Sequence, residues 1–162
     1  MLFIMGKTNS DYNPFLRDDD VSFQMWRLLY HTAFVINRSR QKELAQYGVT
    51  PEQAHVLDIL YQNRGTAKIR DIVNITMRQH HSISTLISRM AVQGLVKKVR
   101  SSSDARQYNV TITEKGRALF RTITRHSITE IFSCLSERDR QGLDNGLKKL
   151  MAKAYKALEK EY

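Results

Sequence analysis

The chain has 162 residues and is 41% hydrophobic, which suits one compact domain or a domain with an oligomerisation segment. Its 26 Lys and Arg residues outnumber its 16 Asp and Glu residues, and the resulting formal charge of +10 favours a polyanionic partner such as nucleic acid. The single cysteine excludes an intrachain disulfide and no apolar run is long enough to span a membrane, so we expect a cytoplasmic protein without membrane contact.

The N-terminal part predicts an irregular arm followed by one long helix. Residues 1–20 contain an Asn-Pro pair and end in three aspartates, which indicates an arm that leads into a helix start. From residue 21 onward, apolar residues recur at steps of three and four, as expected for one face of a helix. They are Val21, Met25, Leu28, Leu29, Val35 and Ile36. Gly48 is expected to end this helix.

Three shorter helices are expected next. Thr50 can cap the first of them, Pro51 fits the first helical position, and Gln53 completes a capping box. After a Gly-containing break at 63–65, a short helix should place Ile69, Ile72 and Val73 inward. The third helix is expected over about 78–93, and it should pack its inner face against the domain. That face consists of Ile83, Leu86, Ile87 and Met90.

The hydrophobic period then changes to two. Residues 95–99 and 108–112 have the alternation of half-buried strands, and the polar loop between them makes the pair a β-hairpin. Thr113 should cap another helix, whose apolar positions continue across residues 119–131. They are Leu119, Phe120, Ile123, Ile128 and Ile131.

The last helix should begin after Ser136, and it carries a narrow stripe with near-heptad steps, which suits a partner helix. The stripe consists of Leu143, Leu147, Leu150, Met151, Ala154 and Leu158. The expected fold class is therefore mainly α with a small β-hairpin: a winged helix-turn-helix over 48–113, with an arm at 1–20. The terminal helices, 21–47 and 114–162, should form a dimerisation region, because neither can bury its stripe alone.

Residues 72–103 contain no Asp or Glu, whereas a solvated surface normally mixes both signs of charge. Chance clustering in a basic chain is the alternative to an anion-facing surface. The outer face of the 78–93 helix offers short polar groups flanked by arginines, which suit the major groove of DNA. We expect major-groove contacts from Arg78, His81, Ser82, Ser84, Thr85, Ser88 and Arg89. We expect phosphate contacts from Lys68, Lys97, Lys98 and Arg100.

The loop of the hairpin ends in Asp104-Ala105-Arg106. An arginine at a hairpin tip can enter a narrow, A·T-rich minor groove, where negative potential is concentrated. Asp104 can either hold an arginine in place through a charge-assisted bond or serve only as a turn former. The residue types alone leave these two interpretations equal.

The segment GLVKKVRSSSDARQYNVTITEKG, residues 94–116, resembles the wing signature of the MarR family of bacterial and archaeal regulators. The matching residues are Gly94, Leu95, Val96, Asp104, Arg106, Val110, Thr113 and Gly116. Length and element order are also similar from Val21 onward. The chain departs from the family at Arg89-Met90-Ala91, where an acidic residue is usual, and at Lys97-Lys98, where an arginine is frequent.

The resemblance implies a winged helix-turn-helix dimer with interlocked terminal helices. It also implies that Arg106 binds in the minor groove, that Asp104 orients basic side chains, and that the helix with Ser84 and Thr85 enters the major groove. We therefore expect a sequence-specific regulator of transcription, a repressor, that binds an inverted repeat in double-stranded DNA as a homodimer. It should need no cofactor or metal and should not be an enzyme, because the sequence has no Gly-rich phosphate loop, no nucleophile elbow and no metal-ligand spacing. Ser39 and Lys42 formally match an S-x-x-K motif, but its partner motifs are absent.

The family also implies a small-molecule effector between the DNA-binding and dimerisation parts. Candidate lining residues, each of which could equally be core, are Trp26, Tyr30, His31, His55 and Tyr61. The main alternative function is an architectural DNA-binding protein with little sequence preference, against which the varied polar face of the 78–93 helix argues. A winged helix that binds only protein is disfavoured by the acid-free window. RNA binding usually requires stacking aromatic side chains, and the wing offers only Tyr108, which lies in a strand.

Overall fold

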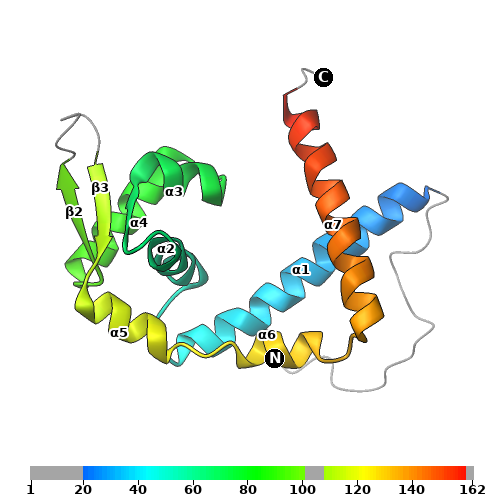
Figure 1. Cartoon of the computed structure of the whole chain (residues 1–162), viewed down its shortest axis with the longest axis horizontal. Coiled ribbons are helices and arrows are strands. Elements are labelled where there is room, and N and C mark those ends of the chain that lie inside the picture. The colour runs from blue at the N-terminus through cyan, green and yellow to red at the C-terminus, as the bar shows by residue number, and fades with distance from the viewer. Residues whose placement is uncertain (1–19, 101–107, 160–162) are drawn as a thin grey trace, which may run out of the picture.

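A computed structural model describes residues 20–100 and 108–159 of the chain (Figure 1). The helices in these residues are α1 (Val21–Ala45), α2 (Pro51–Gln62), α3 (Ile69–Thr76), α4 (His80–Val92), α5 (Glu114–Thr122), α6 (His126–Phe132) and α7 (Glu137–Leu158). The strands are β1 (Thr66–Lys68), β2 (Val96–Arg100) and β3 (Tyr108–Ile112). The mainly helical fold with a small antiparallel sheet confirms the expected fold class.

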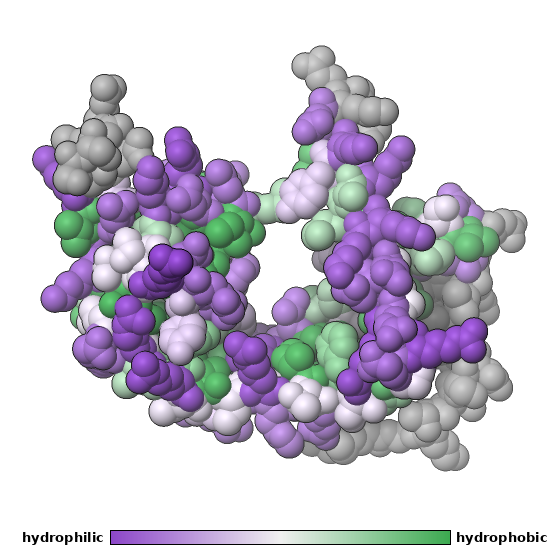
Figure 2. Space-filling view, viewed as in Figure 1, coloured by the Kyte–Doolittle hydropathy of each residue, from purple (hydrophilic) through white to green (hydrophobic). Residues whose placement is uncertain are grey.

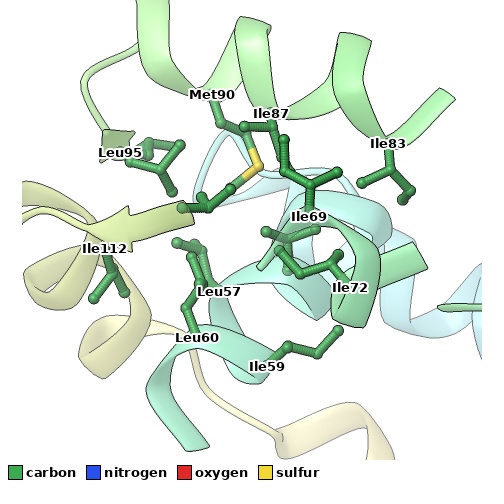
Figure 3. Close-up of a cluster of buried hydrophobic side chains, with 13 residues drawn as sticks. Leu57, Ile59, Leu60, Ile69, Ile72, Ile83, Ile87, Met90, Leu95 and Ile112 are labelled. Carbon is green, nitrogen blue, oxygen red and sulfur yellow. The ribbon is translucent and has the colours of Figure 1, made fainter. Parts of the chain in front are cut away.

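The molecule divides into a compact lobe and extended arms (Figure 1). The lobe contains α2 to α5 and the sheet, while α1, α6 and α7 form the arms. The core of the lobe is a cluster of aliphatic side chains from α2, α3, α4 and the strands, shown in Figure 3. Its fully buried members include Val56, Leu57, Leu60, Ile72, Ile87, Met90 and Val110. Because each such side chain contributes roughly 1.5–3 kcal/mol, this core fixes the mutual positions of α3, α4 and the sheet.

The sheet has the strand order β1-β3-β2, and both pairings are antiparallel. The β2–β3 hairpin was predicted from the sequence, whereas β1 was not. β1 pairs with β3 so that Thr66 lies opposite Thr111, and their hydroxyl oxygens are 3.1 Å apart. Strand β1 has only three residues, and Ala67 is its one partly buried side chain. So short a segment cannot show the alternation of buried and exposed residues that identifies a strand, so only its pairing with β3 reveals it.

The base of the hairpin is closed by Thr113 and Gly116. The Thr113 hydroxyl donates to the carbonyl of Gly94 at 2.7 Å and accepts from the amide of Gly116 at 3.0 Å. Gly116 is buried, and a Cβ at this position would lie 2.1 Å from the carbonyl oxygen of Leu95. The Thr-x-x-Gly spacing noted in the sequence therefore packs the start of α5 directly against the end of the turn that precedes β2.

Besides the Thr113 cap of α5, local capping signals in the sequence placed three helix starts correctly. Thr50 and Gln53 form the reciprocal bonds of a capping box at α2, and Ser136 and Asp139 do so at α7. The Asp20 carboxylate accepts from the amides of Ser22 and Phe23 at the start of α1. These starts depend only on residues within one turn of each other, which is why the sequence predicts them well.

Two expected helix boundaries were wrong. The fourth helix begins at His80 rather than near 78, because Met77 adopts a left-handed backbone (φ 51°) and Gln79 is extended. The helix expected over 114–131 is divided into α5 and α6, because the backbone is extended at Ile123 (ψ 115°). The apolar residues on both sides of this break continue the helical spacing, so the sequence pattern hides it.

The arms carry many apolar side chains at the surface. On α1 these are Val21, Phe23, Met25, Trp26, Leu28, Leu29, Tyr30, Phe34 and Val35; on α7 they are Leu143, Leu147, Leu150, Met151, Tyr155 and Leu158. Figure 2 shows exposed hydrophobic residues beside the hollow between the lobe and the arms. Within the described ranges, no helix is long and apolar enough to cross a membrane.

Candidate nucleic-acid interface

Helix α4 presents one polar face to solvent. Ile83, Ile87 and Met90 are buried in the lobe, which fixes the rotation of the helix about its axis. The side chains on the outer face are those of His81, Ser82, Thr85, Ser88 and Arg89, and all of them are exposed. The expected outer face is thus present, and none of these exposed groups is acidic.

The three serines and His81 on α4 differ in how free their side chains are to contact a ligand. Ser84 is half-buried, and its carbonyl accepts the hydroxyl of Ser88 at 2.9 Å. Ser82 and the Nε2 atom of His81 are 3.4 Å apart, so these neighbours contact each other at the N-terminal turn of α4. Thr85, in the middle of the outer face, has an exposed side chain and is therefore the best placed of the short polar residues.

Arg78 lies in the turn before α4 rather than on the helix. Its Nη2 atom is 3.0 Å from Oε1 of Glu52, near the start of α2. Burial raises the pKa of the Glu52 carboxyl, but hydrogen bonds from the backbone and Thr50 and the charge of Arg78 lower it overall. Glu52 lies 20 residues before the acid-free window, so the sequence did not predict a carboxylate at this edge of α4. Together with His81 and Thr85, the pair borders a shallow hollow between α2 and α4.

The basic residues of the sheet lie on exposed positions. Lys97, Lys98 and Arg100 lie on β2, and Lys68 ends β1. All four side chains are exposed, as the phosphate-contact hypothesis requires. Asp104 and Arg106, the two predicted wing residues, lie outside the described residues.

A buried carboxylate joins α1 to the start of α6, beside the segments that connect the lobe to the arms. Glu43, near the end of α1, is 9% exposed, and its two oxygens accept hydrogen bonds from five donors. They are the backbone amides of His126 (2.8 Å) and Ser127 (3.2 Å), the hydroxyls of Thr124 (2.5 Å) and Ser127, and the guanidinium of Arg40 (2.7 Å). Glu43 therefore caps the N-terminus of α6 from another helix, and this contact explains why α6 begins where it does.

Burial raises the pKa of Glu43, but the hydrogen bonds from Ser127, Thr124 and Arg40 outweigh it and lower the pKa to about 2. Thr124 also accepts at its carbonyl from Arg40 at 2.5 Å, and its hydroxyl is 3.1 Å from that of Tyr47. The two segments that connect the lobe to the arms, at 46–50 and 123–125, are thus tied together at Thr124. The sequence carries no local signal for this junction, because its partners are about 80 residues apart.

A cleft of about 810 Å³ lies between α1, α2 and the α5–α6 segment. Of the five residues expected to line an effector cleft, the structure places only His55 there. Trp26 stacks on Tyr30 on the exposed N-terminal half of α1, with ring centroids 5.9 Å apart, and His31 follows them on that helix. Tyr61 packs on Phe120, with ring centroids 4.8 Å apart. The single chain therefore does not bring the five residues together in this cleft, because helical spacing on α1 does not show which of its faces turns toward α2.

The cleft instead has arginine and apolar walls that the sequence did not single out. Its basic residues are Arg38, Arg40, Arg78 and Arg125, and its apolar residues include Phe34, Leu86, Phe120 and Ile128. Arg40, Arg78 and Arg125 have acidic partners, the last being Asp58 at 3.8 Å. Arg38 contacts the side-chain oxygen of Gln41 at 3.4 Å. Arg78 and Leu86 border both this cleft and the hollow beside α4.

The arrangement of α3, α4 and the β2–β3 hairpin defines a winged helix-turn-helix domain, with α4 in the position of the recognition helix. A sequence model of the MarR family matches residues 47–107, the segment that contains most of this domain. The resemblance noted in the sequence is therefore confirmed: residues 47–107 of the chain are similar to the MarR family.

The chain is also similar to individual transcriptional regulators in sequence and to solved structures in fold. The chain is 29% identical over 105 residues to the HTH-type transcriptional regulator TtmR of Methylorubrum extorquens, a match that covers 64% of this chain and 53% of TtmR. The matched part thus spans about half the length of that relative. The fold is similar to that of the organohalide-sensing regulator RdhR-CbdbA1625 bound to 2,4-dichlorophenol (TM-score 0.75, 19% identity, 90% of this chain and 88% of that one). It is also similar to that of a mutant MarR from E. coli complexed with operator DNA (TM-score 0.72, 17% identity, 82% and 99%). At these identities the two structures show a shared fold.

Proposed function

We propose that the chain is a transcriptional regulator that binds an inverted repeat in double-stranded DNA as a homodimer. It acts as a repressor, and a small-molecule effector modulates its DNA binding. The observation that carries the proposal is the exposed face of α4, which is polar, free of acidic side chains and held in place by the lobe core. The operator complex of the similarly folded MarR mutant supports the same use of this fold.

In the proposed complex, α4 enters the major groove with Thr85 at its centre and His81, Ser82, Ser84, Ser88 and Arg89 around it. Lys68, Lys97, Lys98 and Arg100 neutralise phosphates, and these contacts supply most of the sequence-independent affinity. Arg106 enters the minor groove and Asp104 orients basic side chains of the wing, as the family signature implies. Arg78 is a major-groove ligand, and its guanidinium must leave the Glu52 carboxylate to contact DNA.

The homodimer is supported by the apolar surface of α1 and α7. Trp26 is 55% exposed and Leu158 is 69% exposed. The surface of a monomeric protein rarely contains so many large apolar side chains next to one another. A second copy that packs on both helices would bury these side chains and would place two α4 helices symmetrically on the DNA.

The cleft between α1, α2 and the α5–α6 segment is the proposed effector site. Its size suits a small molecule, and its apolar residues favour a ring or short chain. Arg38, which contacts the side-chain oxygen of Gln41, can pair with a negatively charged group of the ligand. The phenol-bound state of RdhR-CbdbA1625 supports a ligand of this general kind. Because Arg78 and Leu86 border both the cleft and the hollow beside α4, a bound molecule there is adjacent to the DNA-binding face.

Selection of binding sites from random duplexes tests the proposal directly. We expect enrichment of an inverted repeat whose half-site centres are about one helical turn apart, roughly 34–36 Å, because a two-fold dimer presents two equivalent α4 helices. Equal recovery of all sequences, despite tight binding, would instead support an architectural DNA-binding protein.

The contacts of α4 and of the sheet should respond differently to mutation. We expect Thr85→Ala to change base preference in the half-site by on the order of 1–3 kcal/mol, because a lost base contact discriminates between sequences. We expect Lys97→Ala to weaken binding to all sequences alike and to reduce the slope of log affinity against log salt by about one, because a single phosphate contact is lost. Fluorescence anisotropy titrations of both variants against the selected site and a scrambled site, at several salt concentrations, measure both effects.

A further inference from the structure

One aromatic ring lies against two of the basic residues of the wing. In the β2–β3 pairing, Arg100 lies directly opposite Tyr108, and Lys98 lies opposite Val110. Residues two apart on a strand share a face, so the Lys98, Arg100 and Tyr108 side chains project from the same side of the hairpin. The sequence alone assigns Tyr108 no role beyond its position in a strand.

The Tyr108 ring contacts both Lys98 and Arg100. The Nζ atom of Lys98 is 4.4 Å from the ring centroid, and the Arg100 guanidinium carbon is 5.9 Å from it. The Nε atom of Arg100 also donates to the hydroxyl of Tyr108 at 3.2 Å. The aromatic face attracts the ammonium through its quadrupole, while the hydroxyl oxygen accepts from the guanidinium.

These contacts offset the repulsion between two like charges that lie close together on one face. The hydrogen bond from Arg100, with the charges of Arg100 and Lys98, lowers the pKa of the Tyr108 hydroxyl, although burial acts in the opposite direction. The same hydrogen bond raises the pKa of Arg100. A leucine side chain in place of Tyr108 would fill similar space but would leave both cations free to rotate apart.

We propose that Tyr108 is a positioning residue for DNA binding, which holds Lys98 and Arg100 together on one face of the wing so that both contact phosphates of the same duplex. This inference rests on the proposed function of the chain. Holding both side chains reduces the rotamer entropy that each would lose on binding, which is the benefit of a pre-organised site. It does not require Tyr108 itself to touch DNA.

A double-mutant cycle on the full-length chain tests the inference, with a fluorescein-labelled random-sequence duplex of on the order of 30 base pairs as the probe. We expect Tyr108→Leu to weaken binding about three- to tenfold in the wild-type background. We expect it to have no further effect when Lys98→Ala and Arg100→Ala are already present, because Tyr108 acts through these two cations. Tyr108→Phe, which retains the ring but loses the hydroxyl, should have an intermediate effect that disappears in the Arg100→Ala background alone.

Thermal unfolding of each unbound variant verifies that the hairpin is intact. Val99→Thr provides a matched control at an exposed position of β2, on the opposite face from Lys98 and Arg100. If Tyr108→Leu weakens binding equally in the background that lacks both cations, Tyr108 acts by packing or by touching DNA, and the inference is wrong. If the wild-type chain does not bind the duplex at any salt concentration, the proposed function and this inference both fail. If the wild type binds and the cycle shows coupling, both are supported.

Discussion

Replacing Glu43 by glutamine is expected to destabilise the packing of α6 on α1 by roughly 2–4 kcal/mol. The amide would present its NH₂ group to donors that now point at a carboxylate oxygen, and five hydrogen bonds converge on this single side chain. The loss should appear as faster hydrogen exchange in α6 and as a lower first transition in thermal unfolding.

Glu130→Gln is the matched control, because Glu130 lies on α6 itself and its side chain is 73% exposed. Its only described ionic contact is with His126 at 3.7 Å, and exposed pairs of this kind contribute about 0–1 kcal/mol. Equal exchange rates in α6 for wild type and Glu43→Gln would show that the carboxylate does not hold the junction.

The same carboxylate predicts how this junction responds to acid. The pKa of Glu43 is about 2 in the folded chain against an ordinary value of 4.5, so its contribution is fully present above about pH 4.5. As the pH falls from 4.5 toward 2, the unfolded state takes up a proton first and the contribution is lost. The difference corresponds to at most roughly 3 kcal/mol. The stability difference between wild type and Glu43→Gln should therefore shrink over this pH range.

A charged residue in the apolar stripe of α7 is expected to abolish dimer formation. Leu147 is 39% exposed in the single chain and lies between Leu143 and Leu150 on one face of the helix. In the proposed dimer, Leu147→Glu would bury two unpaired carboxylates, one from each copy, at a cost that a helix-pair interface cannot offset. Sedimentation equilibrium should show a dimer for wild type and a monomer for the variant.

The loss of the dimer should also reduce affinity for an inverted-repeat duplex by about 100-fold or more, because two linked half-site contacts become independent. Asn145→Glu places the same charge on the opposite face of α7 and should leave both the dimer and DNA affinity unchanged. A wild-type chain that sediments as a monomer while it binds the duplex tightly would overturn the dimer proposal.

The parts of the fold that the sequence predicted depend on neighbouring residues. The starts of α1, α2 and α7 follow from caps at Asp20, Thr50 and Ser136, each of which bonds to amides within three residues. The outer face of α4 follows from helical geometry once Ile83, Ile87 and Met90 are assigned to the core. Caps and helix faces depend on residues that are close together in the chain, so the spacing of residues in the sequence is enough to predict them.

The parts that the sequence missed depend on contacts between distant segments. Strand β1 exists because Thr66 meets Thr111, and the break before α6 exists because Glu43 reaches His126. The lining of the cleft between α1 and α2 was not predicted for the same reason, since the rotation of α1 relative to α2 decides which of its side chains face the cleft. Glu52 beside Arg78 was missed because it approaches α4 from the start of another helix.

The junction at Thr124 has a mechanical consequence for a symmetric pair of lobes. Both covalent connections to the lobe pass through one small region, where the Thr124 hydroxyl contacts Glu43 and Tyr47. A body attached at one pivot can tilt but cannot slide, so the lobe keeps its distance from the arms while its angle is adjustable. In the proposed dimer, opposite tilts would change the separation of the two α4 helices without altering either surface. This pivot would then govern tolerance to spacer length between half-sites, while base preference within each half-site stays with α4.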